Sequence, residues 1–115
     1  MSVDLLDGVW VVTRYRRDDD LVEPSATGQK PTLEIEGDRL SGTMGVNRLM
    51  GRLVNGLPSD PLAMTMMAGP PEAMRQEDRL LALVKETDQI EADSGGMRMS
   101  RDGLVLIEFQ RWGTV

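Results

Sequence analysis

The sequence has 115 residues and a formal net charge of −6, and it contains neither cysteine nor histidine. We expect residues 1–115 to form a single domain, because a chain of this length buries enough surface to fold without a disulfide or a metal. The absence of cysteine and histidine excludes thiolate chemistry and removes the most common general base and metal ligand. The acidic balance argues against binding to nucleic acid.

No apolar run approaches the roughly 20 residues that cross a membrane, and residues 1–10 lack a basic segment followed by an apolar one. We therefore expect a cytoplasmic protein without a membrane span. Aromatic residues make up only 3% of the chain, whereas methionine occurs nine times. Methionine fills irregular cores or lines adaptable binding surfaces. Five methionines could line an apolar ligand cavity: Met44, Met64, Met66, Met97 and Met99.

Residues 8–17, GVWVVTRYRR, are rich in β-branched and aromatic residues and predict a first strand. Residues 18–31 are polar and interrupted by proline and glycine, so they predict a loop. The acidic run Asp18–Asp20 in this loop indicates a solvated turn. Three adjacent carboxylates without further spaced ligands are only a weak signal for a metal site.

Residues 32–45 alternate apolar and polar side chains on either side of Gly37 and Asp38, which predicts a β-hairpin. Residues 48–54, RLMGRLV, predict the next strand. After a turn, residues 62–69 predict a short apolar strand.

Residues 71–88 predict a helix, because proline suits the first helical turn and strong helix formers follow it. The expected apolar stripe consists of Met74, Leu81 and Val84, broadened by Leu80 and Leu83.

Residues 89–93, 96–100 and 104–112 predict three further strands separated by turn signals. The predicted fold is α+β: a curved, partly open antiparallel sheet or barrel of about eight strands, with one helix packed against it after the fifth strand. Trp10 and Trp112 lie in the first and last strands. These strands pair with each other, or they leave edges for a homodimer.

Gly42, Gly45 and Gly51 occur in a region that otherwise predicts strands, where glycine marks a bend or a close approach of two backbones. Asn47 lies among them, and asparagine tolerates a positive φ and bonds nearby backbone. We interpret these four residues as the corner of a strongly curved sheet. The alternative is an Asn47 side chain that faces a ligand.

Helical spacing places Glu77 on or beside the apolar stripe. A carboxylate there needs partners, because an unpaired buried charge is costly. Asn47, Thr65 and backbone amides of the preceding loop are the candidates, and the favoured interpretation is a structural tie between helix and sheet. The functional alternative is an acid–base carboxylate in a pocket, working with Asn47 or Asp60.

Three motifs in fixed order resemble those of the META domain family, which includes the HslJ heat-shock protein. They are LDGVW at residues 6–10, GTMGVNRLMG at residues 42–51, and TMMAGP at residues 65–70 followed by Met74 and Glu77. The resemblance extends from about Leu6 to Arg111. It implies a small antiparallel β structure with one packed helix, in agreement with the strand count.

Members of the META domain family are bacterial and kinetoplastid proteins linked to heat shock, drug resistance, motility or secretion. The resemblance supplies no enzymatic activity and no catalytic residue. It implies a pair of motif cysteines that form a disulfide, and the corresponding positions here are Val46 and Gly69. The loss of both partners together suits a reducing compartment, where such a bond would not persist.

The sequence therefore predicts a non-enzymatic META domain, without metal or cofactor, that binds a partner or ligand in a stress response. Two alternatives remain open. The first is a barrel that binds a small apolar ligand in a methionine-lined cavity, and the second is an enzyme that uses Glu77.

Overall fold

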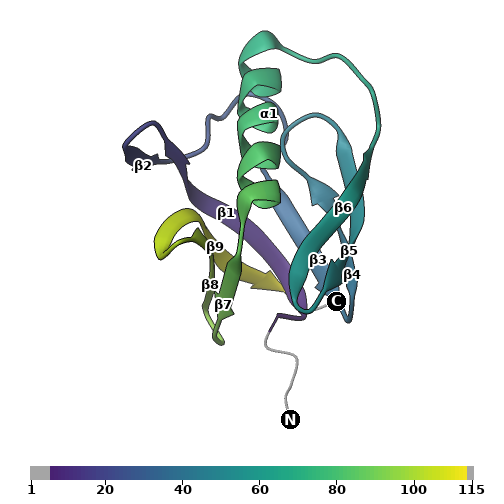
Figure 1. The fold of residues 1–115 in the computed structure, drawn as a ribbon. Coiled ribbons are helices and arrows are strands. Elements are labelled where there is room, and N and C mark those ends of the chain that lie inside the picture. The colour runs from purple at the N-terminus through teal and green to yellow at the C-terminus, as the bar shows by residue number, and fades with distance from the viewer. Residues whose placement is uncertain (1–5, 114–115) are drawn as a thin grey trace.

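The computed structural model describes residues 6–113, with the side chain of Asp60 outside the described part (Figure 1). Over these residues the chain forms nine strands and one helix. In chain order they are β1 (Gly8–Arg17), β2 (Asp20–Val22), β3 (Thr32–Glu36), β4 (Arg39–Thr43), β5 (Arg48–Val54), β6 (Leu57–Met64), α1 (Pro71–Glu86), β7 (Gln89–Ala92), β8 (Gly96–Arg101) and β9 (Leu104–Gly113).

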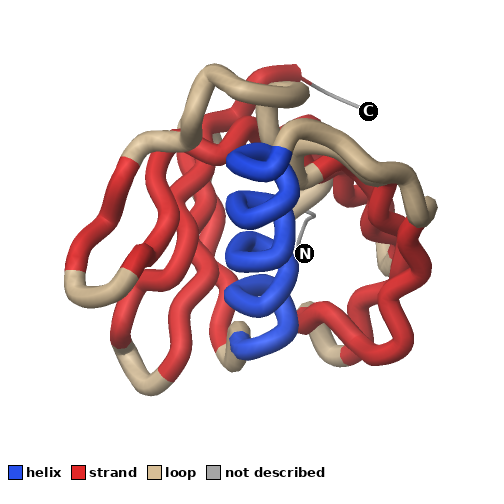
Figure 2. Tube along the Cα trace, turned by 90° about the horizontal axis from the view of Figure 1, so that it is seen from above, coloured by secondary structure: helices blue, strands red, loops and turns tan. Residues whose placement is uncertain are grey.

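Eight strands form one antiparallel sheet in the order β6-β5-β4-β3-β1-β9-β8-β7, and the short β2 pairs with β1. The sheet curls into a barrel with one seam between its edge strands β6 and β7. Figure 2 shows α1 lying between the two arms of this sheet. The α+β class and the barrel-like architecture predicted from the sequence are confirmed.

The core joins the helix to the inner face of the sheet. Leu80, Leu83 and Val84 of α1 pack in one cluster with buried residues of six strands, among them Leu33, Leu49 and Ile107. Burial of such side chains is the main driving force for folding. Of the two alternatives left open for the first and last strands, the structure shows pairing, because Trp10 of β1 lies opposite Arg111 of β9.

The two tryptophans differ in their surroundings. Trp10 is fully buried, its indole N–H donates to the carbonyl of Leu6 at 2.8 Å, and the Arg111 guanidinium lies 4.2 Å from its ring centroid. Trp112 is exposed, and the Lys30 ammonium lies 5.6 Å from its ring centroid. Trp10 is thus a core residue at the place where β1 pairs with β9.

A bulge in β1 decides which side chains of this strand face the helix. Trp10 and Val12 are buried in alternation, and the register against β9 then shifts between Val12 and Arg14. A bulge of this kind moves the buried face from even to odd positions. As a result Tyr15 is buried and faces α1, whereas Arg14 is exposed.

Helix α1 begins at Pro71 and ends at Glu86, two residues before the predicted end. It carries Glu72 in the first turn and Lys85 in the last, an arrangement that suits the helix dipole. The predicted stripe is right for Leu80, Leu83 and Val84, which are buried, and wrong for Met74 and Leu81, which are only half-buried. The buried face also includes Ala73, Gln76 and Glu77.

Two further expectations need correction. The strand predicted at 62–69 begins earlier, at Leu57, because the turn before it is a two-residue one in which Asn55 and Gly56 both have positive φ. It ends at Met64. The Thr65 N–H still donates to the carbonyl of Arg48 at 3.1 Å, but the Thr65 hydroxyl and the Met67 N–H bond to the Asn47 side chain. The predicted loop at 18–31 contains the short strand β2.

The motif glycines lie where added side chains would be strained or crowded. Gly42 has φ +154°, and a Cβ there would collide with the carbonyl oxygen of Thr32 in the neighbouring strand. Gly45 has φ +141°, a conformation that L side chains rarely adopt. A Cβ on Gly51 would collide with the Leu62 side chain. The Gly42 contact agrees with the interpretation of close backbone approach in a curved sheet, whereas Gly51 meets the end of a side chain and Gly45 meets no atom closer than 3.5 Å.

Candidate functional site

Glu77 is buried between α1 and the loop that joins β4 to β5, with 2% of its surface exposed. Its Oε1 accepts hydrogen bonds from the backbone N–H of Val46 at 2.9 Å and of Asn47 at 2.6 Å. Its Oε2 accepts a bond from the Asn47 side-chain amide at 2.8 Å. Three N–H donors thus surround a buried carboxylate, as burial of a charge requires.

Asn47 also forms hydrogen bonds to the segment after β6, and so links that segment to Glu77. Its Nδ2 also donates to the carbonyl of Met67 at 3.1 Å, and its Oδ1 accepts from the Met67 N–H at 2.6 Å and the Thr65 hydroxyl at 3.0 Å. The Asn47 amide therefore uses both donors and both acceptor positions. It is 4% exposed, so the side chain faces the protein.

The predicted partners of Glu77 are thus partly right. Asn47 and the loop amides bind the carboxylate directly, whereas Thr65 reaches it only through Asn47. Asn47 is not among the described non-glycine residues with positive φ, which are Asp18, Asn55 and Asp102. Asn47 therefore stabilises this corner of the sheet through the hydrogen bonds of its side chain and not through an unusual backbone conformation.

Val46 and Gly69, the positions at which the resemblance implies two cysteines, lie side by side. A Cβ built on Gly69 would lie 3.4 Å from the Val46 Cβ, close to the roughly 3.8 Å that separates these atoms in disulfides. The side chain of Val46 occupies the space that a second side chain would need, because its Cγ2 lies 2.7 Å from that Cβ position. An apolar contact here replaces the covalent link.

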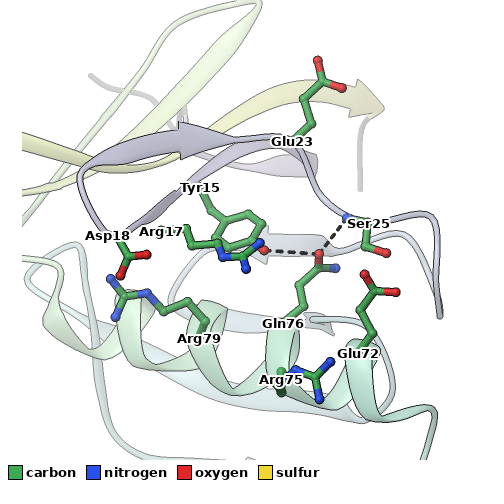
Figure 3. A pocket seen from close by; sticks show the side chains of 9 residues that line it. All are labelled: Tyr15, Arg17, Asp18, Glu23, Ser25, Glu72, Arg75, Gln76 and Arg79. Carbon is green, nitrogen blue, oxygen red and sulfur yellow. Dashed lines mark hydrogen bonds between the residues drawn. The ribbon is translucent and has the colours of Figure 1, made fainter.

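A polar pocket of about 590 Å³ lies on another side of α1, between the helix, the end of β1 and the segment after β2 (Figure 3). This volume falls within the range of small-molecule sites, about 300–1,000 Å³. Nine residues line it: Tyr15, Arg17, Asp18, Glu23, Ser25, Glu72, Arg75, Gln76 and Arg79.

Gln76 forms the buried wall of this polar pocket, with 4% of its surface exposed. Its Oε1 accepts the Ser25 N–H at 2.7 Å and a long bond from the Tyr15 hydroxyl at 3.4 Å. Its Nε2 is the one buried side-chain nitrogen or oxygen atom in residues 6–113 that lacks a hydrogen-bond partner. Figure 3 shows this nitrogen on the side of Ser25 and Glu72.

The charged residues of the polar pocket are three arginines and three acids, and most of these side chains are uncommitted. Within the described part of the chain none of the six forms a salt bridge. Glu72 accepts a hydrogen bond from the Thr27 hydroxyl at 2.9 Å, and Arg79 donates to the carbonyl of Arg16 at 3.1 Å. The pocket therefore offers both signs of charge to an incoming molecule.

The polar pocket was not predicted from the sequence, although two features of the sequence indicate it. Arg75 and Arg79 are four residues apart, so they share one face of the helix. Gln76 lies next to Glu77 at helical spacing from Leu80 and Leu83, which places a second polar side chain on the buried face. The remaining residues come together only through the bulge in β1 and the hairpin formed by β1 and β2.

The expected methionine-lined cavity is not assembled as predicted. Met66 is 93% exposed and cannot line an interior space. Met44, Met97 and Met99 are buried and belong to the packed core, and Met64 packs against this core. The side chain of Asp60, which the enzyme hypothesis paired with Glu77, lies outside the described residues.

The described residues contain no group of three or more acidic side chains that could hold a metal ion. No helix within residues 6–113 has the length and apolar character that a membrane crossing requires.

Comparison with known proteins gives one match. The family model described as META domain matches residues 3–112, nearly the whole chain. Searches of curated proteins and of solved structures gave no match.

Proposed function

The chain belongs to the META domain family, and from this premise we propose that it is a non-enzymatic binding domain that acts in a stress response. The observation that carries this proposal is the contrast between its two polar regions. Glu77 carries the buried carboxylate that the enzyme hypothesis assigns to acid–base catalysis. This carboxylate already accepts hydrogen bonds from three N–H donors. The polar groups of the pocket beside Gln76 remain available to a ligand.

Catalysis through Glu77 has less support. A general base must lie within hydrogen-bond reach of the proton that it removes, and a carboxylate that is 2% exposed offers a substrate no approach. The chain also has no histidine or cysteine to act as a second catalytic group. The absence of cysteine further suits a reducing compartment, so we place the protein in the cytoplasm.

Binding of an apolar ligand inside the barrel is the second candidate that we considered, and the packing of Met44, Met97 and Met99 in the core argues against it. Self-association is compatible with the proposal. The sheet has two edges, and β7 is the one that a second copy could extend, because β6 carries Pro58 and Pro61.

The proposal is tested by measuring turnover and capture with the same protein. Wild type and Glu77→Gln are assayed on chromogenic carboxylic esters, phosphate esters and glycosides at a temperature at which circular dichroism shows both to be folded. We expect no turnover above buffer from either protein. The immobilised wild type is expected to capture a small molecule or protein that becomes more abundant after heat shock.

Glu91→Gln provides the matched control, because it makes the same chemical change at an exposed position of β7. Turnover by the wild type and by Glu91→Gln that disappears in Glu77→Gln would overturn the proposal in favour of an enzyme.

A further inference from the structure

The unpartnered Gln76 Nε2 is an anomaly of this structure. A buried N–H group without an acceptor costs free energy, and native proteins leave few of them. Its neighbours do not supply the acceptor: the Glu72 carboxylate makes no bond to it and accepts from the Thr27 hydroxyl through Oε1, and the oxygen of the Gln76 amide accepts from the Ser25 N–H. An acceptor atom brought by a ligand would complete the set.

A ligand can reach this nitrogen from the polar pocket. Glu72 and Arg75 are exposed side chains on the rim, and exposed side chains of this kind change rotamer freely on a short timescale. The amide itself is held in place by its bond to Ser25 at 2.7 Å. A donor fixed in this way recognises a ligand oxygen with little loss of conformational entropy.

The charges indicate what else the ligand carries. Arg17 and Arg75 have no side-chain partner in residues 6–113, and the same holds for Asp18 and Glu23. A purely anionic ligand would satisfy the arginines but would be repelled by the acids. A purely cationic ligand would meet the reverse problem. A molecule with one group of each sign is complementary to the whole lining.

We propose that the polar pocket binds a small zwitterion of the amino acid or dipeptide class, a proposal that rests on the binding function proposed above. The ligand's carboxylate accepts hydrogen bonds from Gln76 Nε2 and the guanidinium groups of Arg17 and Arg75. Its ammonium group is held by the carboxylate of Glu72, which lies on the same side of Gln76 as Nε2 (Figure 3). Arginine is well suited to this role, because its planar fork binds both oxygens of a carboxylate.

The test uses the free amino acids and glycylglycine as probes, with the backbone amides of the ¹⁵N-labelled full chain observed by NMR. We expect at least one probe, at up to millimolar concentration, to shift the Ser25 and Gln76 resonances in a saturable manner. Arg75→Gln and Gln76→Met are each expected to weaken that binding about tenfold, the loss typical of one charge-assisted hydrogen bond. Lys85→Gln, which removes an exposed helix charge outside the pocket, is the matched control and should leave it unchanged.

Blocked probes separate the two charges of the ligand. The N-acetylated and the C-amidated forms of the best probe should each bind about tenfold more weakly than the free form. Equal binding of either blocked form, or of inorganic phosphate, would overturn the zwitterion assignment. The absence of any probe-dependent shift in the pocket would also overturn it. None of these results would contradict the proposed binding function. That proposal is overturned by a different result, namely enzymatic turnover that requires Glu77.

Discussion

Gln76 and Glu77 are neighbours in α1 with nearly the same burial, at 4% and 2% exposure, and both reach from the helix to a loop of the sheet. Glu77 holds the loop between β4 and β5, and both of its oxygens are satisfied. Gln76 holds the segment after β2 through one oxygen, and its nitrogen has no acceptor. Two adjacent side chains of nearly the same shape and size thus differ in how many of their hydrogen-bonding atoms have a partner within the protein.

This difference separates a structural role from a binding role by a physical criterion. A buried polar network that is fully satisfied stabilises one arrangement of the chain. An unsatisfied donor beside an open pocket is available to the acceptor atom of an incoming ligand.

The largest effect is expected for Glu77→Met, which keeps the length of the side chain and removes the carboxylate. The N–H groups of Val46 and Asn47 and the Asn47 amide then lose their acceptor inside the protein. We expect the free energy of unfolding to fall by about 4 kcal/mol. Urea denaturation measures it, with an unchanged m-value as the control for two-state behaviour. A loss below about 1 kcal/mol would contradict the structural role of Glu77.

The next largest effect is a gain in stability. The double variant Val46→Cys/Gly69→Cys should form a disulfide, because the two Cβ positions lie 3.4 Å apart. Closing a loop of about two dozen residues is expected to stabilise the fold by about 3 kcal/mol in the chain-entropy model. The measurement is urea denaturation of the oxidised form, with the same variant in reducing agent as control.

The disulfide lies in the Glu77 region, so it should leave ligand binding in the polar pocket unchanged. Two free thiols per chain after oxidation, counted by thiol titration, would show that the backbone positions of Val46 and Gly69 are not compatible with a bond.

The sequence was sufficient for most of the fold, because its signals are local. Alternation along β3 and β4, the glycine turns and the proline-initiated helix each follow from neighbouring residues. The errors arose where distant contacts decide. The segment leaves the sheet after Thr65, where the Met67 N–H bonds to the Asn47 side chain, and alternation cannot reveal this contact.

The candidate site was only half predictable for the same reason. Burial of Glu77 follows from helical spacing, and the need for partners follows from the cost of a buried charge. The polar pocket requires Tyr15 to face the helix, which depends on the bulge between Val12 and Arg14. A single residue of register changes the face of a strand, and nothing in the residues around Thr13 marks that shift.

Asn47→Ala tests how much the hydrogen bonds beyond Glu77, from Asn47 to the segment after β6, contribute to stability. The substitution removes the acceptor of the Met67 N–H and one of the three donors to Glu77. We expect a loss of about 2 kcal/mol, smaller than for Glu77→Met because the segment around Met67 is exposed and can bond to water. Amide hydrogen exchange should show lost protection at Met67. Thr65→Val is the control and should cost less than Asn47→Ala.

The smallest effect is expected for Gln76→Met, which makes at position 76 the change already described at position 77. The substitution removes the bond to the Ser25 N–H, which stabilises the fold, and it also removes the Nε2 group that destabilises it. These two contributions oppose each other, so the free energy of unfolding should change by no more than about 1 kcal/mol. A loss equal to that of Glu77→Met would mean that Gln76 is as structural as its neighbour. The same substitution at two adjacent buried positions therefore compares how much each side chain contributes to the free energy of unfolding. A small loss at position 76 beside a large loss at position 77 is the result expected if Gln76 serves ligand binding and Glu77 serves the fold.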